Sequence, residues 1–343
     1  MTRRLLLDVD TGTDDAGALL LAATWADFEV VAATATWGNC SRDQAAANTL
    51  AVLRAAGCDA PVHPGEAGPR GPVPSAAHAD LVMMSDGLGG CGVVPPPDAA
   101  PEAEAGAEAI VRWARAEPGE LTLVATAPLS TVAAALALEP QLPSLLADVV
   151  VMGGSIALGG NLTAAAEANI GHDPTAAAAV VDAFGAPGAL ASGRPPMLVS
   201  LDATLGARLT DAELEALGDS ALPGAPLLYR IWSAIWPTSV LETGGAGEWP
   251  AHDLLAIWAL VDADVFTWET LPVAVDVGGS AAWGSTVVDR RLARYEAWAG
   301  DDPERLHVLE ALRNVSPSRW AVATAVDADR FRSGVRAWLA RER

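Results

Sequence analysis

The sequence predicts an α/β protein with a mostly parallel open sheet and helices on both faces. Apolar runs with strand character, each ending in a turn signal, alternate with Ala-rich helical stretches along the first two thirds of the chain. This alternation is typical of βαβ units. Of the 343 residues, 51% are hydrophobic and 19% are charged, which fits a globular protein with a substantial core. Because no Ser/Gly-rich or charged linker separates two halves, we expect residues 1–343 to form one domain.

The expected elements can be listed in chain order. The strand-like runs are RLLLDVD (4–10), EVVAATATWGN (29–39), LTLVATAP (121–128), DVVVMGG (148–154) and PMLVSLD (196–202). The Pro- and Gly-rich residues 59–104 predict long loops, and PAHDLLAIWALV (250–261) predicts a helix. Residues 270–315 contain LPVAVDVGG and WGSTVVDRR, which predict a hairpin at a sheet edge. An amphipathic helix is expected to close the chain from about Asp327 to Arg343.

Polar side chains follow these apolar runs, at the points where the strands are expected to end. In an open parallel sheet, ligands bind at the carboxyl ends of the strands. We therefore expect the functional site at that edge. The candidate residues are Asp8, Asp10, Asp14 and Asp15 after the first run, Asn39 after the second, Thr126 after the third, Asn161, Glu167 and Asn169 after the fourth, and His252 and Asp253 in the later helix.

The charge balance excludes several classes of partner. The net charge is -22, and all 21 basic residues are Arg. Such a surface repels phosphate backbones and anionic lipids, so we expect no nucleic-acid or membrane partner and favour a neutral ligand or a cation. The N-terminal MTRRLLLDVD does not resemble a signal peptide, and no segment is long and charge-free enough to span a bilayer. Three cysteines without paired spacing predict reduced thiols in a cytoplasmic protein.

The aspartates of the first turn predict a metal site. Asp8 and Asp10 are two positions apart on a strand and share one face, while Asp14 and Asp15 follow Gly12 and begin a helix. A helix cap or a strand-end turn explains one or two of them. Four carboxylates this close repel one another unless a cation neutralises them. Ligands that are all oxygen atoms favour Ca²⁺ or Mg²⁺.

One group of enzymes that begins with an apolar strand ending in D-x-D is the haloacid-dehalogenase phosphatases. LLLDVDTG resembles their first strand loosely, with the first Asp as nucleophile and the second as general acid. These Mg²⁺-dependent enzymes usually carry a Lys that contacts the phosphoryl group, and this chain has no Lys. Their pattern also leaves the adjacent Asp14 and Asp15 unexplained.

A second resemblance extends over residues 5–330. DVDTGTDDAGAL resembles the D-x-D-x-G-x-D-D-A-x-A-L signature of the inosine/uridine-preferring nucleoside hydrolase family. Further blocks of that family are matched in the same order by ATWGN, SDGLGG, VATAPLSTVA, MGGSIALGGNLTAAAEANIGHDPTAA and HDLLA. Ordered blocks over a whole domain are far more specific than a single D-x-D.

The resemblance implies a Ca²⁺-dependent ribonucleoside N-ribohydrolase, which cleaves the N-glycosidic bond to free base and ribose. It implies that the Ca²⁺, at the carboxyl edge of the sheet, also holds the attacking water and two ribose hydroxyls. The implied Ca²⁺ ligands are Asp10, Asp15, Asp253 and the main-chain carbonyl of Thr126. Asp10 is also the implied general base, His252 the acid for the leaving base, and Asp8 a supporting residue. The implied sugar-binding residues are Asp14, Asn39, Asn161, Glu167 and Asn169.

The chemistry of this reaction suits an acidic pocket. Cleavage of a glycosidic bond passes through an oxocarbenium-like sugar, and negative charge stabilises that state more than the neutral substrate. A strongly acidic protein also favours nucleosides over nucleotides. Two alternatives stay open: the Mg²⁺-dependent phosphatase, and a nucleoside- or sugar-binding protein that has kept the fold and lost turnover. Members of the family are often dimers or tetramers, so the resemblance implies a homo-oligomer.

The sequence leaves the preference for purine or pyrimidine open. Trp232 and Trp236 are four positions apart on one helical face, which suits either core packing or a lid that stacks on the base. Family members often have His-Gly before the D-G-L-G block, where this chain has Met83 and Met84. Two further positions depart from the family pattern, Ala168 in place of a Phe and Thr131 in place of an Asn.

Overall fold

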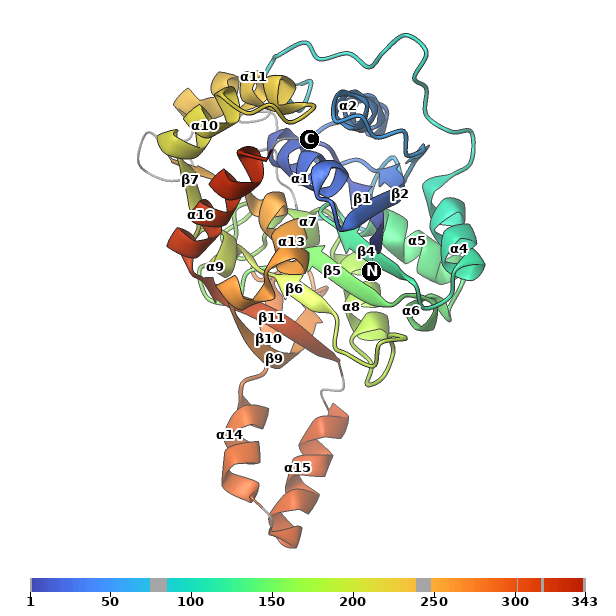
Figure 1. Cartoon of the computed structure of the whole chain (residues 1–343). Helices are drawn as coiled ribbons and strands as arrows, with labels where there is room; N and C mark the ends of the chain where they lie inside the picture. Colours follow the sequence, from blue (N-terminus) through green and yellow to red (C-terminus); the bar gives the residue numbers. More distant parts are fainter. Residues whose placement is uncertain (1, 75–84, 239–247, 301, 316–317, 342–343) are drawn as a thin grey trace.

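The computed structural model describes residues 2–74, 85–238, 248–300, 302–315 and 318–341 (Figure 1). Within them, a nine-stranded sheet has the order β10-β9-β11-β6-β5-β4-β1-β2-β3. Its strands are β1 (Arg3–Val9), β2 (Phe28–Ala35), β3 (Val62–Pro64), β4 (Leu121–Ala125), β5 (Asp148–Met152), β6 (Met197–Val199), β9 (Phe266–Val275), β10 (Thr286–Val288) and β11 (Arg319–Val326). A separate antiparallel pair is formed by β7 (Arg208–Thr210) and β8 (Glu248–Pro250).

The sheet is parallel from β3 to β11 and antiparallel where β9 pairs with β11 and with β10. This confirms the predicted mostly parallel sheet and the predicted edge hairpin, because β10 is the terminal strand beside β9. The stretch predicted as loops, 59–104, also contains the short strand β3, which pairs with β2 at the opposite edge. Pro64 suits this edge position because proline has no backbone N–H to donate to a further strand.

Helices cover both faces of the sheet, as predicted (Figure 1). The helices on one side of the sheet share one apolar cluster and are α1 (Thr13–Thr24), α2 (Arg42–Ala55), α9 (Leu201–Thr204), α10 (Asp211–Gly218), α11 (Ala225–Ile235), α13 (His252–Val261) and α16 (Ala328–Leu339). Of these, α10 and α11 pack against other helices, with α11 on α1 and α2 and α10 on α16. The other face packs against α4 (Gly106–Ala116), α5 (Ser130–Leu138), α6 (Leu142–Leu145), α7 (Ala168–His172) and α8 (Pro174–Phe184). Two short 3₁₀ turns are η1 (Trp236–Thr238) and η2 (Ala263–Val265).

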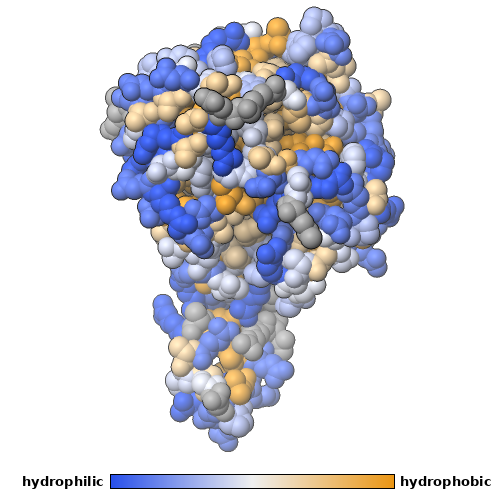
Figure 2. Space-filling view, viewed as in Figure 1, coloured by the Kyte–Doolittle hydropathy of each residue, from blue (hydrophilic) through white to orange (hydrophobic). Residues whose placement is uncertain are grey.

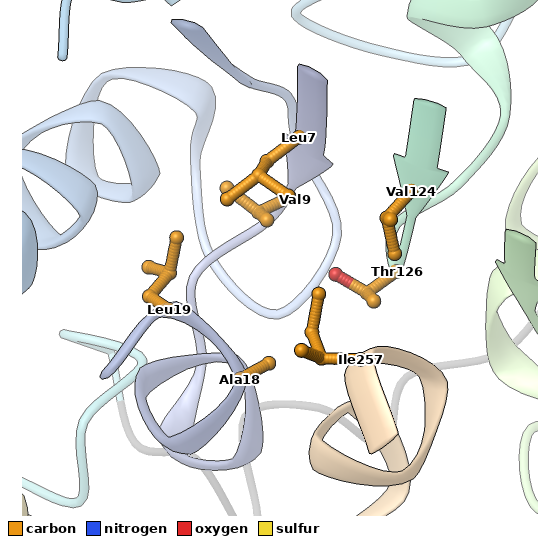
Figure 3. A pocket seen from close by; sticks show the side chains of 7 residues that line it. All are labelled: Leu7, Val9, Ala18, Leu19, Val124, Thr126 and Ile257. Carbon is orange, nitrogen blue, oxygen red and sulfur yellow. The ribbon is translucent and has the colours of Figure 1, made fainter. Parts of the chain in front are cut away.

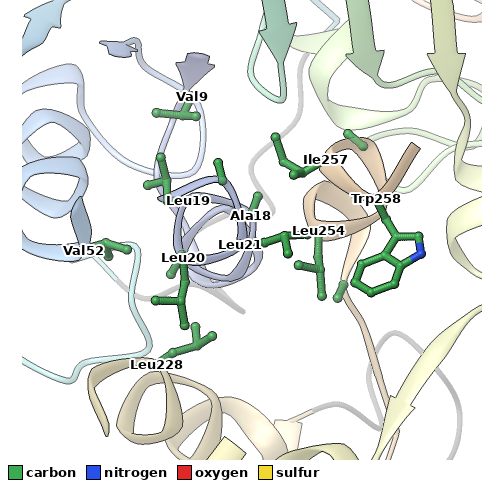
Figure 4. Packing of buried hydrophobic residues seen from close by; sticks show 14 of the residues in the cluster. Val9, Ala18, Leu19, Leu20, Leu21, Val52, Leu228, Leu254, Ile257 and Trp258 are labelled. Atoms are coloured by element: carbon green, nitrogen blue, oxygen red, sulfur yellow. The ribbon is translucent and has the colours of Figure 1, made fainter. Parts of the chain in front are cut away.

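Helix α1 is the buried centre of the first face, between α2, α11 and α13 (Figure 4). Its sequence TDDAGALLLAAT is apolar on all sides after the first turn, as expected for a helix without a solvent face. Leu19, Leu20 and Leu21 are each at most 1% exposed. Burial of each such side chain contributes about 1.5–3 kcal/mol, so this core holds the acidic first turn of α1 in place.

The last part of the chain contains a capped C-terminal helix and a projecting helical hairpin. Helix α16 is capped by Asp327, whose side chain accepts a hydrogen bond from the Arg330 amide, and this confirms the predicted closing helix. Helices α14 (Arg291–Ala299) and α15 (Pro303–Val315) form a hairpin that projects from the body next to β10 (Figure 1). This helical hairpin was not predicted from the sequence. Figure 2 shows hydrophobic residues at its surface.

Candidate active site

Three carboxylates meet where two helices begin. Asp14 and Asp15 lie in the first turn of α1, and Asp253 lies in the first turn of α13. Ligand oxygens of the three all lie within 4.8 Å of one another, and the side chains are 7%, 0% and 2% exposed. Because α1 and α13 pack side by side, both helix N-termini point their partial positive charge at this group. The structure therefore brings together two predicted Ca²⁺ ligands and one predicted sugar-binding residue.

Asp10 lies beside this group, one residue beyond the end of β1. Its Oδ2 accepts a hydrogen bond from the Asn39 amide at 2.7 Å, and its Oδ1 accepts one from Asn39 Nδ2 at 3.2 Å. Asn39 Nδ2 also lies 3.3 Å from Asp15 Oδ2, and the Asp10 and Asp15 carboxyls are hydrogen-bonded to each other. The turn between them is closed by the Gly12 amide, which donates to Asp15 Oδ2 at 2.9 Å. Asn39 thus holds both carboxylates in a fixed orientation.

Burial and mutual repulsion make these carboxyls weak acids. Burial, followed by the charge of Asp15, raises the pKa of Asp10 well above its usual range, and burial with the charge of Asp14 raises the pKa of Asp15 to about 6. Burial and the three neighbouring aspartates raise the pKa of Asp253 well above its usual range. Within the described part of the chain, no arginine forms a salt bridge with Asp10, Asp15 or Asp253. Such an all-oxygen donor set fits a hard divalent cation.

Thr126 follows β4 and faces the same group. Its hydroxyl donates to Asp15 Oδ1 at 2.8 Å, and its amide donates to the Asp8 carbonyl at 2.9 Å. The main-chain carbonyl of Thr126, the predicted ligand, accepts a hydrogen bond from Asn169 Nδ2 at 3.0 Å. The carbonyl keeps a second lone pair, so the contact with Asn169 leaves it able to bind a cation.

Asp8 lies behind the acidic turn, on β1, and is 0% exposed. Thr34 donates its hydroxyl to Asp8 Oδ1 at 2.5 Å, while Oδ2 is buried without a hydrogen-bond partner among the described residues. Burial, opposed by the Thr34 hydrogen bond, raises the pKa of Asp8 to about 7, and the charge of Asp15 adds to this. The carboxyl therefore responds to the charge of the acidic group formed by Asp14, Asp15 and Asp253.

The residues predicted to bind the sugar form a second side of the site. Glu167 caps α7 and accepts hydrogen bonds from the amides of Gly154, Asn169 and Ile170 at 2.8, 2.9 and 3.1 Å. Asn169 Nδ2 donates to the carbonyls of Thr126 and Met152, and the Thr126 hydroxyl in turn donates to Asp15, which links this side to the acidic group. Burial raises the pKa of Glu167, and the three amides oppose that effect.

Asn161 lies at the outer rim of this side. It is exposed, and its Oδ1 accepts a hydrogen bond from the Ala168 amide at 2.9 Å. The side chain is thus attached to the residue before Asn169 rather than to the acidic turn. Of the predicted sugar-binding residues, Asp14, Asn39, Glu167 and Asn169 are brought together by the contacts described above, and Asn161 joins them through α7.

His252 begins α13, directly before Asp253, and is 9% exposed. Its Nδ1 lies 2.7 Å from Thr204 Oγ1, and Thr204 Oγ1 lies 3.3 Å from the Leu201 carbonyl. When the hydroxyl donates to Leu201, it accepts from Nδ1–H of the imidazole. His252 also interacts electrostatically with Glu167, which lowers the pKa of that carboxyl slightly against the effect of burial. Thr204 was not singled out from the sequence, because a lone threonine in a short helix carries no pattern.

The predicted base-stacking pair separates into two different environments. Trp232 is 1% exposed, its Nε1 donates to the Thr13 carbonyl at 2.8 Å, and a Cβ at Gly17 would lie 2.6 Å from its ring. A ring packed under α1 cannot stack on a base, so the lid prediction for Trp232 is wrong and the core-packing alternative is supported. Trp236 is half-buried in η1, with Nε1 donating to Asp211 Oδ1 at 2.7 Å. Met83 and Met84 lie outside the described residues.

A small cavity lies beneath the acidic group, and its wall is apolar apart from one hydroxyl (Figure 3). It is lined by Leu7, Val9, Ala18, Leu19, Val124, Thr126 and Ile257. A void between β1, β4, α1 and α13 whose one hydroxyl, that of Thr126, already donates to Asp15 does not offer the several hydrogen-bond partners that a sugar needs. This cavity is therefore a packing defect of the core below the site and not the substrate pocket.

The carboxyl edge of the parallel sheet carries buried carboxylates, amides and a histidine, which is the composition and position of an enzyme active site. The comparisons with known proteins agree. The family model described as "Inosine-uridine preferring nucleoside hydrolase" matches residues 5–333. The chain belongs to this family, as the order of its motifs predicted. It is therefore a nucleoside hydrolase, and the phosphatase alternative is excluded.

Individual relatives match over most of the chain. "Uridine nucleosidase 1" of Arabidopsis thaliana is 32% identical over 308 residues, covering 88% of this chain and 85% of the relative. "Pyrimidine-specific ribonucleoside hydrolase RihA" of Salmonella arizonae is 33% identical over 290 residues, covering 84% and 89%. Among solved structures, the plant nucleoside hydrolase PpNRh1 matches with a TM-score of 0.82 and 27% identity over 100% of both chains. These matches confirm the predicted fold.

The predictions on thiols, membrane association and partners can be compared with the structure and the family. Cys40, Cys58 and Cys91 are free thiols, each half-buried. Within the described ranges, the structure contains no helix that is both long enough and apolar enough to cross a membrane. A small-molecule nucleoside partner is consistent with the family.

Proposed function

We propose that this protein is a Ca²⁺-dependent ribonucleoside N-ribohydrolase that uses water to cleave a nucleoside into free base and ribose. The observation that supports this most is the buried group of Asp14, Asp15 and Asp253 next to Asp10. Among the described residues, no arginine forms a salt bridge with Asp10, Asp15 or Asp253, and a cation is the simplest way to keep several of these carboxylates ionised. All-oxygen ligands with several carboxylates suit Ca²⁺.

The residues that would hold Ca²⁺ are Asp10, Asp15, Asp253 and the carbonyl of Thr126, with Asp14 at contact distance of the same group. When bound, Ca²⁺ supplies the positive charge that keeps these carboxylates ionised and makes a nearby water more acidic. Asp10 accepts the proton of the attacking water on a carboxylate oxygen. Asn39 fixes that carboxylate through two hydrogen bonds, so the base is oriented before substrate arrives.

The sugar is held by residues on both sides of the acidic group. Asp14, Asn39, Glu167, Asn169 and Asn161 offer carboxylate and amide groups to its hydroxyls. Glu167 and Asn169 are themselves fixed by backbone hydrogen bonds, so they bind the sugar in one orientation. As the glycosidic bond lengthens, positive charge develops on the ribose, and the surrounding carboxylates stabilise it.

The departing base must receive a proton, and His252 is the residue placed to supply it. Thr204 holds the imidazole by Nδ1, which directs the opposite nitrogen away from Thr204. The glycosidic bond breaks, the base takes its electron pair, and the proton passes from His252 to the base nitrogen. Trp236, unlike Trp232, keeps part of its ring accessible and stays a candidate for contact with the base.

A substrate panel tests the proposal. The relatives named for uridine and pyrimidine ribonucleosides make uridine the first substrate, followed by inosine, UMP and p-nitrophenyl phosphate. We expect free ribose from nucleosides, no phosphate from the esters, loss of activity with EDTA and recovery with Ca²⁺. Nucleoside binding without release of ribose would instead show a binding protein that has lost turnover.

Two further expectations accompany the proposal, a cytoplasmic location and a homo-oligomer. The free thiols support the first, and the family resemblance supports a dimer or tetramer. Light scattering on the purified protein measures the second directly. A monomer at micromolar concentration would contradict it.

A further inference from the structure

Asn48 lies on α2, outside every residue assigned above, and its side chain is 1% exposed. Nδ2 donates to the main-chain carbonyls of Thr11 at 3.0 Å and Asp86 at 2.8 Å. Oδ1 accepts a hydrogen bond from Gln44 Nε2 at 2.9 Å. The two N–H groups of one buried amide thus donate hydrogen bonds to carbonyls of two different loops. A leucine or alanine at this position would leave both carbonyls without this donor, and the Thr11 carbonyl is buried.

The first carbonyl belongs to the acidic turn. Thr11 lies between Asp10 and Gly12, and the Gly12 amide binds Asp15. Helix α2 contacts the same residue a second time, because the hydroxyls of Thr11 and Thr49 are 2.6 Å apart. The helix therefore fixes the peptide that sets the direction of the Asp10 carboxylate and the spacing between Asp10 and α1.

The second carbonyl belongs to the loop 86–92, which contains the D-G-L-G block. The Asp86 carboxylate accepts hydrogen bonds from the amides of Leu88, Gly90 and Gly92 at 3.0, 2.9 and 3.2 Å, so the loop is folded around Asp86 as one unit. Whatever holds the Asp86 carbonyl consequently holds the whole loop. The loop also contacts α11, since Cys91 Sγ lies 3.6 Å from the Arg230 carbonyl.

The loop packs directly on the segment that carries Asn39. Gly87 has φ +71°, and a Cβ there would lie 3.0 Å from Cys40 Sγ and 3.3 Å from Asn48 Nδ2. Cys40 follows Asn39, and its Sγ lies 3.9 Å from Asn48 Nδ2 and 3.8 Å from the Asp10 carbonyl. Asn48 is therefore the point at which the acidic turn, the 38–40 segment and the loop 86–92 meet.

We propose that Asn48 is a positioning residue that fixes the acidic turn and the loop 86–92 relative to each other. It acts on Ca²⁺ through the Thr11 carbonyl and on the nucleoside through the segment that carries Asn39. The inference rests on the proposed function, because it assigns Ca²⁺ and nucleoside to these two segments. It predicts that one substitution, distant from the reacting atoms, weakens both ligands at once.

Asn48→Leu, which removes both donors at similar volume, and Asn48→Ser, which keeps one, test this together with the control Gln44→Ala. Gln44 binds the other end of the same amide and leaves both N–H bonds in place. We expect the Ca²⁺ Kd from calorimetry to rise at least tenfold in Asn48→Leu, with a smaller rise in Asn48→Ser. The KM for uridine at saturating Ca²⁺ should rise in the same order, while Gln44→Ala changes either quantity less than twofold.

The melting temperature of the metal-free variants separates positioning from plain stability. A lower melting temperature with unchanged Ca²⁺ Kd and unchanged KM would overturn the inference, because it would show that Asn48 only supports the fold. If Asn48→Leu fails to fold, Asn48→Ser decides the matter by the same criterion. A wild-type protein that binds no Ca²⁺ and cleaves no nucleoside would overturn the proposed function itself, whereas normal wild-type behaviour with unaffected variants overturns this inference alone.

Discussion

Asp8 offers a direct test of the electrostatics beneath the site. In the metal-free protein, burial raises its pKa from the ordinary value of 3.8 to about 7. A carboxyl whose pKa is higher in the folded than in the unfolded state binds more protons when folded, so the free energy of unfolding falls as pH rises from about 4 to about 7. The difference between the two pKa values corresponds to about 4 kcal/mol, an upper limit for this side chain.

Asp8→Asn removes this titration while keeping the shape and the acceptor for the Thr34 hydroxyl. We expect the unfolding free energy of the variant, minus that of the wild type, to increase by up to about 4 kcal/mol between pH 4 and pH 8 in EDTA. Urea unfolding at half-unit pH steps measures it. Titrating groups that do not interact with Asp8, including His172, whose pKa burial lowers to about 4, are present in both proteins and cancel in the difference.

Two controls sharpen the test. Thr34→Val removes the hydrogen bond that lowers the pKa of Asp8, so the midpoint of the pH-dependent difference should move to higher pH. Saturating Ca²⁺ should shrink the difference, because a cation next to Asp15 favours the ionised form of Asp8. A difference that is constant from pH 4 to pH 8 would refute the reasoning, since it would mean that Asp8 has the same pKa in the folded and unfolded states.

Further predictions concern the metal, the reaction and the core. Ca²⁺ at a hundredfold excess over Kd should stabilise the protein by roughly 2.7 kcal/mol, and an unchanged melting temperature in EDTA would contradict the metal site. Asp10→Asn should lower kcat on uridine by several orders of magnitude, whereas a mild loss would remove it as the base. His252→Ala should lose about 10² to 10⁴-fold on uridine but little on p-nitrophenyl riboside, and equal losses would make it a positioning residue. Trp232→Ala should lower the unfolding free energy by about 3–5 kcal/mol, while Trp236→Ala should change KM more than stability.

The sheet and the acidic turn could be predicted because their signals are local. Strands buried on both faces appear as apolar runs, and the residues that follow each run reach the same edge of the sheet. Asp14, Asp15 and Asp253 illustrate this, since the sequence placed each of them at the start of a helix next to the expected site. The family motifs added roles that the spacing of residues alone does not contain.

The residues that the sequence did not reveal act through long-range hydrogen bonds. Thr204 is hydrogen-bonded to His252, and Asn48 to Asp86. The partners lie far apart in the sequence, so no helical or strand periodicity predicts these contacts. A helical spacing of four predicts only that Trp232 and Trp236 share a face, and it does not say whether that face meets a core or a ligand. Gly17 decides the matter for Trp232, because it leaves room for the ring under α1. Whether a tryptophan packs in the core or contacts a ligand therefore depends on a packing partner that lies far away in the chain.

The buried acidic group destabilises the metal-free fold, and we attribute its presence to the proposed function. Asp8, Asp10, Asp15 and Asp253 are all buried, and the raised pKa of each shows that the ionised form is disfavoured in the metal-free protein. An arginine among them would favour their ionised form, yet it would occupy the space of a divalent cation and neutralise the charge that would stabilise the oxocarbenium-like sugar of the proposed reaction. The apolar core around α1 supplies the stability that tolerates the uncompensated group. If the group binds Ca²⁺ as proposed, the protein should be stabilised by Ca²⁺, and increasingly so at higher pH, where the carboxylates are ionised.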